Sequence, residues 1–221
     1  MKIEIWSDIV CPFCYIGKRR IENALAKFRH ADKIEVEWKS FLLNPDQVSD
    51  PSKTTAEYLS ETKGWSYEQT LNSIKQVTQM AAEEGLTYLL EKSVVANPKD
   101  AHRVLQYAKT QGKGDKMKER LFKAYFTESA NIADHNLLTE LAGEIGLDKA
   151  KVKQVLDTDE FSDKVAQDIY ESRQLEVRGV PFFVLDNKYG ISGAQSPEVF
   201  KETLEKAWAN FEKEPTQITG I

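Results

Sequence analysis

Residues 2–17, KIEIWSDIVCPFCYIG, hold the pattern that decides the fold. The first apolar residues alternate with charged ones, which predicts a strand. Cys11 and Cys14 follow shortly after it. Pro12 between them suits the first turn of a helix, where a backbone N–H has no partner in any case. Apolar residues at helical spacing continue this helix to about His30. The stretch therefore predicts a strand that leads into a helix, with two cysteines at the junction.

The pattern on either side of this junction extends the prediction to a mixed fold. Residues 34–39 alternate again, which predicts a second strand, parallel to the first, and so a β-α-β unit. A break rich in proline and aspartate follows, and beyond it we expect helices and no strand as far as residue 159. The helices are predicted at about residues 55–63, 67–84, 97–112, 117–125, 137–145 and 149–156.

The C-terminal part returns to a mixed pattern. It predicts a helix at about 161–175, a buried strand at 180–185, a returning strand at 189–192 and a helix opening at Ser196-Pro197. These elements and the N-terminal unit need each other to form one sheet with helices on both faces. We therefore predict an α/β domain made of residues 1–45 and 160–212, an all-helical insertion at 46–159 and a C-terminal tail at 213–221.

Composition excludes several classes of protein. The 221 residues are 41% hydrophobic and 29% charged, which is enough apolar material for a buried core. Mean hydropathy is -0.51, and no apolar run approaches the roughly 20 residues of a membrane span. Glu4 and Asp8 interrupt the N-terminus where a secretory signal needs apolar residues, so we expect a cytoplasmic protein. The net charge of -5 argues against nucleic acid as a partner.

Cys11 and Cys14 are the only cysteines, too few for a disulfide scaffold. A helix N-terminus favours a thiolate, so we expect Cys11 to be exposed, to have a lowered pKa and to attack disulfides. Cys14, one turn later, is placed to resolve the mixed disulfide. Two inert cysteines are one alternative. A zinc site is another, disfavoured because His30, His102 and His135 are not paired at ligand spacing.

Four further features are candidates for a site. Pro181 opens an apolar strand and marks either a strand start, which the pattern favours slightly, or a cis bond. Asn97 is most simply a helix cap, and His102 on the same helix is more often structural than catalytic. The basic stretch Lys113–Lys123 is interleaved with acidic residues, which predicts a solvated helix face.

Taken together, these motifs resemble a known family. The chain is similar to the DsbA-like thioredoxin superfamily, most closely its FrnE-like branch, in the right order over nearly its whole length. The matching segments are Trp6-Ser7-Asp8, Cys11 to Gly17, Trp38 to Phe41, Leu43-Asn44-Pro45, Asn97 with Ala101-His102-Arg103, Leu121-Phe122 with Ala124-Tyr125-Phe126, Gly179 to Val184, and Ser192 to Gln195.

The resemblance implies a thioredoxin fold interrupted by a helical domain, and a thiol-disulfide oxidoreductase acting on disulfide-containing proteins or small-molecule thiols. It implies a cis Pro181 that faces the cysteines, and a Val180 backbone that pairs with an extended substrate. The implied site residues are the nucleophile Cys11, the resolving Cys14, the tuning residues Pro12 and Phe13, and the substrate-binding Val180 and Pro181, with Asn97 and His102 as secondary candidates.

Some properties stay open. Secreted DsbA-type oxidants carry signal peptides, and we expect none here, so oxidation, reduction and isomerisation are all possible directions. A more distant resemblance, to 2-hydroxychromene-2-carboxylate isomerases and kappa-class glutathione transferases, implies a glutathione-dependent enzyme, although those typically have serine in place of Cys11. Glutathione would then be a co-substrate and would bind near Cys11, Val180 and Gly193. A chaperone-like binding module is a third hypothesis. No metal, membrane or nucleic acid is expected, and either a monomer or a homodimer fits.

Overall fold

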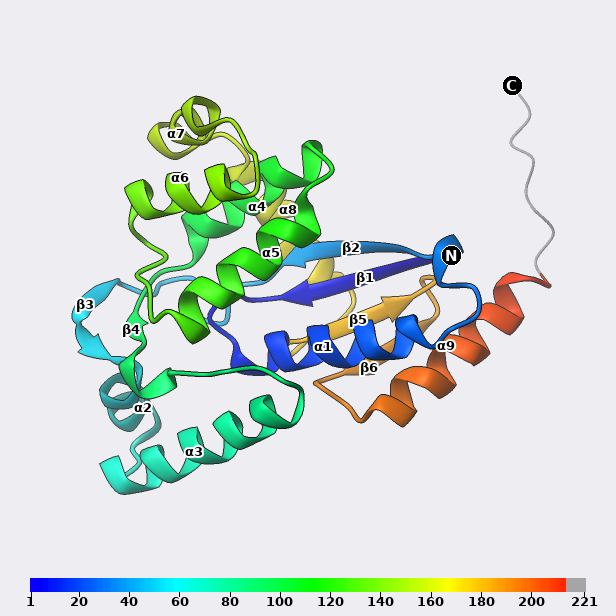
Figure 1. Cartoon of the computed structure of the whole chain (residues 1–221), viewed down its shortest axis with the longest axis horizontal. Coiled ribbons are helices and arrows are strands. Elements are labelled where there is room, and N and C mark those ends of the chain that lie inside the picture. The colour runs from blue at the N-terminus through cyan, green and yellow to red at the C-terminus, as the bar shows by residue number, and fades with distance from the viewer. Residues whose placement is uncertain (214–221) are drawn as a thin grey trace.

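The computed structural model describes residues 1–213, so positions 214–221 of the predicted tail lie outside the described residues. A four-stranded sheet in the order β2-β1-β5-β6 forms its centre (Figure 1). As predicted, β1 (Lys2–Ser7) and β2 (Glu35–Ser40) are parallel. The late strands β5 (Phe182–Leu185) and β6 (Tyr189–Ser192) add to β1 as an antiparallel hairpin. The sheet therefore needs both ends of the chain.

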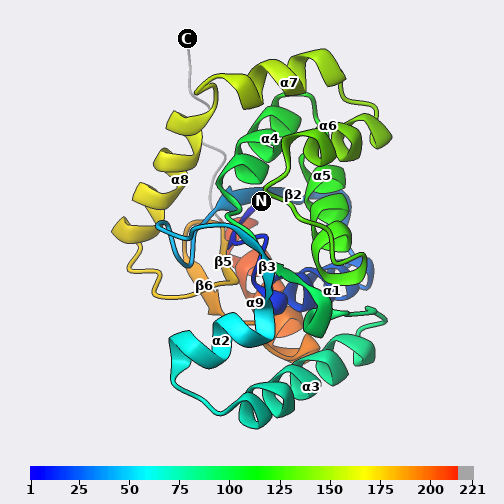
Figure 2. The ribbon, with the colours of Figure 1, turned by 90° about the vertical axis from the view of Figure 1, so that its left-hand side faces the viewer.

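Helices cover both faces of this sheet. On one face α1 (Pro12–Ala26) packs against α9 (Pro197–Phe211), and on the other α8 (Ser162–Gln174) packs against β2 (Figures 1 and 2). Alternate residues of β1, such as Ile3 and Ile5, are fully buried between these layers. This arrangement confirms the thioredoxin fold with an inserted helical region.

The insertion lies between β2 and α8. Side-chain capping boxes begin two of its helices: Thr54 pairs with Glu57, and Ser66 with Gln69. Its elements are β3 (Asp50–Thr54), α2 (Thr55–Lys63), α3 (Tyr67–Glu83), the 3-10 turn η2 (Leu90–Lys92), β4 (Val94–Val95), α4 (Lys99–Thr110), α5 (Gly114–Phe122), the π-helical turn η3 (Lys123–Thr127), α6 (His135–Glu144) and α7 (Lys149–Asp157). All of them lie within the predicted insertion, whose limits at 46 and 159 stay a prediction.

Two short strands in the insertion were not expected. β3 and β4 form an antiparallel pair of their own, separate from the central sheet. The expectation of no strand was wrong here because β3 is polar and contains Pro51, while β4 has two residues. Neither shows the alternation that identifies a strand in sequence.

The first helix also ends earlier than predicted. α1 ends at Ala26, and a short 3-10 turn, η1 (Ala31–Lys33), leads into β2. Phe28, which extended the predicted helix, still packs inward, with its ring 6.0 Å from that of Trp208. The helical spacing of apolar residues therefore continued to Phe28 because this side chain packs against the core, although the helix itself ends at Ala26.

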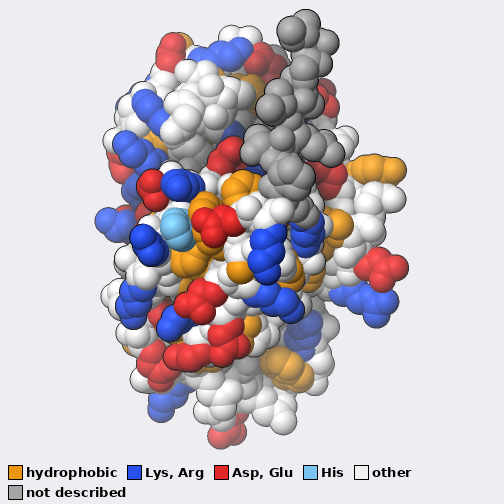
Figure 3. All heavy atoms as spheres, turned by 90° about the vertical axis from the view of Figure 1, so that its right-hand side faces the viewer, with side chains coloured by type: hydrophobic (Ala, Val, Ile, Leu, Met, Phe, Trp, Pro, Cys, Tyr) orange, Lys and Arg blue, Asp and Glu red, His pale blue; other side chains and the backbone are white. Residues whose placement is uncertain are grey.

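The surface is mixed in charge. On the face in Figure 3, acidic and basic side chains lie side by side with small apolar patches between them. Among residues 1–213, no helix is both long and apolar enough to cross a bilayer.

Candidate active site

Cys11 lies at the junction between the loop after β1 and α1. It is the N-cap residue of α1, and Pro12 is the first helical residue, as expected. The Cys11 thiol donates to the Val180 carbonyl, with Sγ 3.4 Å from the oxygen. Only 4% of Cys11 is exposed, and Cys14 is fully buried. The expectation of an exposed first thiol was therefore wrong, because the loop before β5 covers it.

Burial and the second thiol act against thiolate formation at Cys11. The adjacent Cys14 side chain raises the pKa of Cys11 most strongly, and burial and the Asp8 carboxylate raise this pKa further, well above its usual range. The Cys14 backbone N–H lowers the pKa of Cys11, as expected at a helix N-terminus, but it is outweighed. The expected lowering of the pKa of Cys11 is therefore not found in this structure, in which Val180 covers the thiol.

Pro181 lies directly against the first turns of α1. The Val180–Pro181 bond is cis, as the resemblance implied, which decides between the two alternatives. A Cβ atom added at Gly17 would lie 2.9 Å from Pro181 Cγ, so only glycine lets α1 approach this closely. The Pro181 carbonyl accepts a hydrogen bond from Gly193 N–H at 2.8 Å, which ties this loop to the end of β6.

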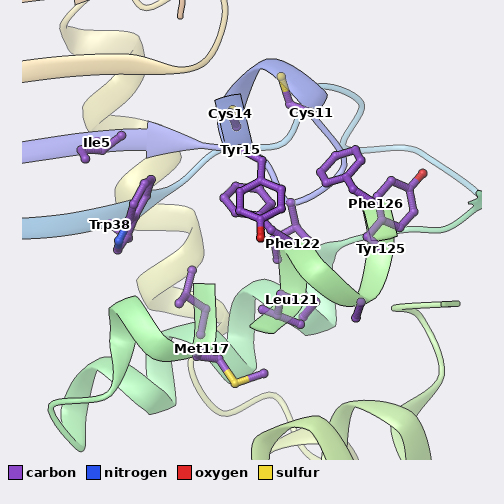
Figure 4. Packing of buried hydrophobic residues seen from close by; sticks show 14 of the residues in the cluster. Ile5, Cys11, Cys14, Tyr15, Trp38, Met117, Leu121, Phe122, Tyr125 and Phe126 are labelled. Atoms are coloured by element: carbon purple, nitrogen blue, oxygen red, sulfur yellow. The ribbon is translucent and has the colours of Figure 1, made fainter. Parts of the chain in front are cut away.

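The two residues between the cysteines have different surroundings. The Pro12 carbonyl accepts a hydrogen bond from the hydroxyl of Tyr88, a contact of 2.7 Å that the sequence did not indicate. Phe13 is 39% exposed. The Tyr88 ring stacks on those of Tyr15 and Phe126, and Tyr15 also stacks on Phe122. Figure 4 shows Tyr15, Phe122 and Phe126 beside the cysteines.

The two secondary candidates, His102 and Asn97, lie in different surroundings. His102 is fully buried, and its Nε2 lies 3.5 Å from Oδ1 of the equally buried Asp8. Burial lowers the pKa of His102, although its hydrogen bond to Asp8 opposes this shift. Asn97 donates to the Gln47 carbonyl and accepts from Lys99 N–H. Pro98 is the N-cap of α4, so Asn97 only assists the start of this helix.

A groove of about 570 Å³ opens beside Cys11. One wall comes from the cysteine loop and Val180, and the other from the insertion. Apolar side chains provide most of the insertion wall, among them Leu59, Ile74 and Val77. Neither Cys14 nor His102 lines the groove, so Cys11 is the thiol that a molecule in the groove would meet.

One buried lysine near the thiols was missed. The sequence predicted a solvated face for Lys113–Lys123, yet Lys118 of α5 is fully buried. Its Nζ lies 3.3 Å from the carbonyl oxygen of Ser7. A signal was present, because Lys118 lies between Met117 and the apolar pair Leu121-Phe122 on the buried side of the helix. Within residues 1–213, no group of three or more His, Cys, Asp or Glu side chains could hold a metal ion.

The chain is similar to several known proteins. The DSBA-like thioredoxin domain family matches residues 2–205. The Bacillus subtilis (strain 168) protein YwbO is 32% identical over 211 residues, or 91% of this chain and 94% of YwbO. The crystal structure of a probable DsbA oxidoreductase from Streptomyces coelicolor is 38% identical, with a TM-score of 0.92 over 99% of this chain and 93% of that chain.

More distant structures share the fold alone. The cytosolic disulfide reductase DsbM from Pseudomonas aeruginosa has a TM-score of 0.68 at 16% identity, over 95% of this chain and 100% of its own. A 2-hydroxychromene-2-carboxylate isomerase has a TM-score of 0.70 at 13% identity, over 97% of this chain and 100% of its own. The match over residues 2–205 and the two relatives above 30% identity show that the chain belongs to the DSBA-like thioredoxin domain family.

Proposed function

We propose that the protein is a thiol-disulfide oxidoreductase of the FrnE-like branch, with Cys11 as nucleophile and Cys14 as resolving thiol. The carrying observation is the position of Cys11 Sγ, at the start of α1 and 3.4 Å from the Val180 carbonyl, where it lines the groove. Membership of the DSBA-like family and the oxidoreductases among its structural relatives support this proposal.

The proposed exchange uses both thiols and needs no other group. Cys11 loses its proton and attacks one sulfur of a substrate disulfide R–S–S–R′, and R′–S⁻ leaves and takes up a proton. Cys14 then loses its proton and attacks the Cys11 sulfur, which forms the Cys11–Cys14 disulfide and releases the second substrate thiol. The protein supplies two electrons and two protons. The Cys11 thiol must give up its hydrogen bond to Val180 as it attacks, which frees that carbonyl to pair with an extended substrate.

We expect the dithiol to work as a reductant in the cytoplasm. A stabilised thiolate favours the reduced form and makes a dithiol more oxidising, as in DsbA. The Cys11 thiol is instead buried and donates a hydrogen bond to the Val180 carbonyl, a contact that holds it in the neutral form. The reduction potential should therefore lie nearer to that of thioredoxin, about -270 mV, than to that of DsbA, about -120 mV. A redox titration in thiol buffers, followed by intact mass, measures it; a DsbA-like value would exclude the reductant role.

Two cysteine variants test the exchange itself. Cys11→Ser should lose disulfide reduction altogether, while Cys14→Ser should accumulate a mixed disulfide with glutathione because nothing resolves it. Intact mass spectrometry after incubation with glutathione disulfide distinguishes the two products. Full activity in Cys11→Ser would show that this thiol is not the nucleophile, and the proposed function would fall with it.

Glutathione is a second candidate, as co-substrate of an isomerase or transferase. The groove favours it, because a space of about 570 Å³ beside Cys11 exceeds what a lone thiol contact requires. The distant relative DsbM has also been solved with GSH. Equilibrium dialysis of the Cys11→Ser variant with glutathione tests this idea without covalent capture, and absence of binding would remove it.

A further inference from the structure

Tyr88 lies in the loop between α3 and η2, and its hydroxyl reaches the turn that holds the two cysteines. The hydroxyl donates to the Pro12 carbonyl at 2.7 Å, although the two residues are 76 positions apart in the chain. Only 5% of Tyr88 is exposed. Pro12 lines the groove and Tyr88 does not, so Tyr88 contacts the cysteine turn from outside the space that a substrate would occupy.

The loop around Tyr88 is fixed to η3 on both sides of the ring. Leu89 N–H donates to the Phe126 carbonyl at 2.7 Å. The Thr127 hydroxyl donates to the Thr87 carbonyl, also at 2.7 Å. The Tyr88 ring itself stacks on that of Phe126, with centroids 4.8 Å apart. A side chain held by this many contacts has little conformational freedom left to lose, so its hydroxyl is preorganised toward its acceptor.

The Pro12 carbonyl belongs to the peptide unit that carries the first N–H donor of α1. Cys11 is the N-cap and Pro12 has no N–H, so this donor is the N–H of Phe13. An N-cap side chain can accept from the second and third helical residues, which are Phe13 and Cys14 here. Cys14 N–H already donates to the Cys11 carbonyl at 3.0 Å, whereas Phe13 N–H has no acceptor among residues 1–213. Phe13 N–H is therefore the freer of the two donors.

This N–H becomes important when Cys11 loses its proton. As a thiol, Cys11 donates to the Val180 carbonyl, and its side chain accepts no capping hydrogen bond. A thiolate has no proton to donate to that carbonyl, so it must exchange the contact for N–H donors at the start of α1. Hydrogen bonds in series polarise one another, so the bond from Tyr88 to one end of the peptide unit makes the Phe13 N–H at its other end a stronger donor.

We propose that Tyr88 is a positioning residue that stabilises the Cys11 thiolate through the Pro12–Phe13 peptide unit, an inference that rests on the proposed function. Tyr88 touches neither the substrate nor the reacting sulfur atoms, and it acts by fixing and polarising the first peptide of α1. Burial raises the pKa of Tyr88 well above its usual range, so the hydroxyl keeps the proton that it donates. The insertion thereby offsets part of the burial that disfavours ionisation of Cys11.

The acid dissociation constant of Cys11 tests this assignment. Alkylation rates with iodoacetamide, measured across pH in a Cys14→Ser background, give the constant for a single thiol. Tyr88→Phe removes the hydroxyl and keeps the stacking ring. It should lower the constant by about two- to fourfold, because cooperative strengthening of about 10–30% acts on a charge-assisted hydrogen bond. Asp8 of the preceding loop and Lys118 of α5 also face Cys11, and the tyrosine variants leave both unchanged.

Tyr15→Phe is the matched control. Tyr15 is as buried as Tyr88, at 3% exposure, and the two rings stack with centroids 6.1 Å apart. The Tyr15 hydroxyl, however, donates to the Glu119 carboxylate at 2.6 Å and accepts from Arg19 at 3.2 Å. Tyr15→Phe should therefore leave the acid dissociation constant of Cys11 unchanged within the error of the measurement. An unchanged constant in Tyr88→Phe, or an equal fall in both variants, would overturn the inference.

An ortho-fluorinated tyrosine in place of Tyr88 covers the case in which Tyr88→Phe does not fold. Fluorine beside the hydroxyl makes it more acidic and therefore a stronger donor, while the contact with Pro12 is kept. Cys11 should then become more acidic than in the parent chain, a shift opposite to that in Tyr88→Phe. A constant equal to or below that of the parent would overturn the inference. All of these outcomes leave the proposed function intact, which would fall instead if the wild type did not reduce disulfides.

Discussion

The paired strands β1 and β2 end in facing serines, Ser7 and Ser40, yet the buried polar groups around these serines are bonded very differently. Beside Ser40, the Asp168 carboxylate accepts hydrogen bonds from Ser40 N–H at 2.7 Å and from Gln106 Nε2 at 2.6 Å. Gln106 also donates to the Ser40 hydroxyl, and Lys39 lies 3.5 Å from Asp168. We call these four residues the Asp168 network.

Beside Ser7 the bonding is sparse. Within the described part of the chain, the Ser7 hydroxyl and His102 Nδ1 have no hydrogen-bond partner, and Lys118 has its single long one. We call Ser7, Asp8, His102 and Lys118 the thiol-side cluster. A fully bonded buried network rigidifies a structure, whereas unpaired buried groups cost stability and are kept where they serve another purpose. The Asp168 network therefore stabilises the fold, whereas the thiol-side cluster lies beside the cysteines and is bonded less completely.

The largest expected effect breaks the Asp168 network. Asp168→Ala should lower the free energy of unfolding by about 3–5 kcal/mol, because it removes a buried carboxylate, leaves the Ser40 N–H without its acceptor and takes one partner each from Gln106 and Lys39. Denaturant unfolding measures this loss. Asp163→Ala, at an exposed position of the same helix, should cost less than about 1 kcal/mol. Equal losses in the two variants would show that the network does not hold α8 to the sheet.

Removing Lys118 from the thiol-side cluster should have the opposite effect and raise the free energy of unfolding. The pKa of Lys118 is lowered from 10.5 to about 8, so below pH 8 both the folded and unfolded chains carry the ammonium and its unfavourable burial is complete. Lys118→Met should then raise the free energy of unfolding by about 1–3 kcal/mol. Between about pH 8 and 10.5 the folded wild type sheds the proton that the unfolded chain keeps, so wild type gains stability and the advantage of the variant shrinks.

Urea unfolding at several pH values checks this sign. Lys18→Met is the control, because Lys18 is paired with carboxylates and its loss should lower stability by about 1 kcal/mol. A stability loss in Lys118→Met as large as that in Lys18→Met would contradict the idea that the thiol-side cluster is under-bonded.

Substitutions of the facing serines, Ser7 and Ser40, should have the smallest effects on stability, and they form the most closely matched pair of variants. Ser40→Ala removes an acceptor of Gln106 and should cost about 1–2 kcal/mol. Ser7→Ala removes a hydroxyl without a partner among residues 1–213 and should change stability by less than about 0.5 kcal/mol. Thermal unfolding of the two variants compares them directly. If Ser7→Ala proved the more damaging, the Ser7 hydroxyl would have a partner that the described contacts omit.

Much of the fold could be predicted because the elements carry local signals. Alternation identified β1, the Ser196-Pro197 pair marked the start of α9, and glycine marked the end of α3. The order of the elements also required the two ends of the chain to share one sheet. The pair β3–β4 was missed because its residues show no alternation, and α1 was predicted too long because the partly buried Phe28 packs against the core beyond the end of the helix.

The site was less predictable because it depends on contacts between distant segments. The cysteine pair was evident in the sequence, and the cis Pro181 was implied only by the family resemblance, since the pattern itself slightly favoured a strand start. The burial of Cys11 depends on Val180, 169 residues later in the chain. Charge alternation suggested an exposed face around Lys118, while the apolar neighbours that bury it lie on β2 and on its own helix. The roles of Cys11, Cys14, Pro12, Phe13, Val180 and Pro181 in catalysis stay predictions.

The split sheet has a consequence for the order in which the protein is made. β1 and β2 leave the ribosome early, but β5, the second neighbour of β1, follows only after the whole insertion has been synthesised. Until then one edge of β1 has no partner strand, and Cys11 lacks the loop that covers it. The nascent chain therefore carries an open strand edge and an accessible thiol for most of its synthesis, and both are closed by the same late segment around residues 180–185.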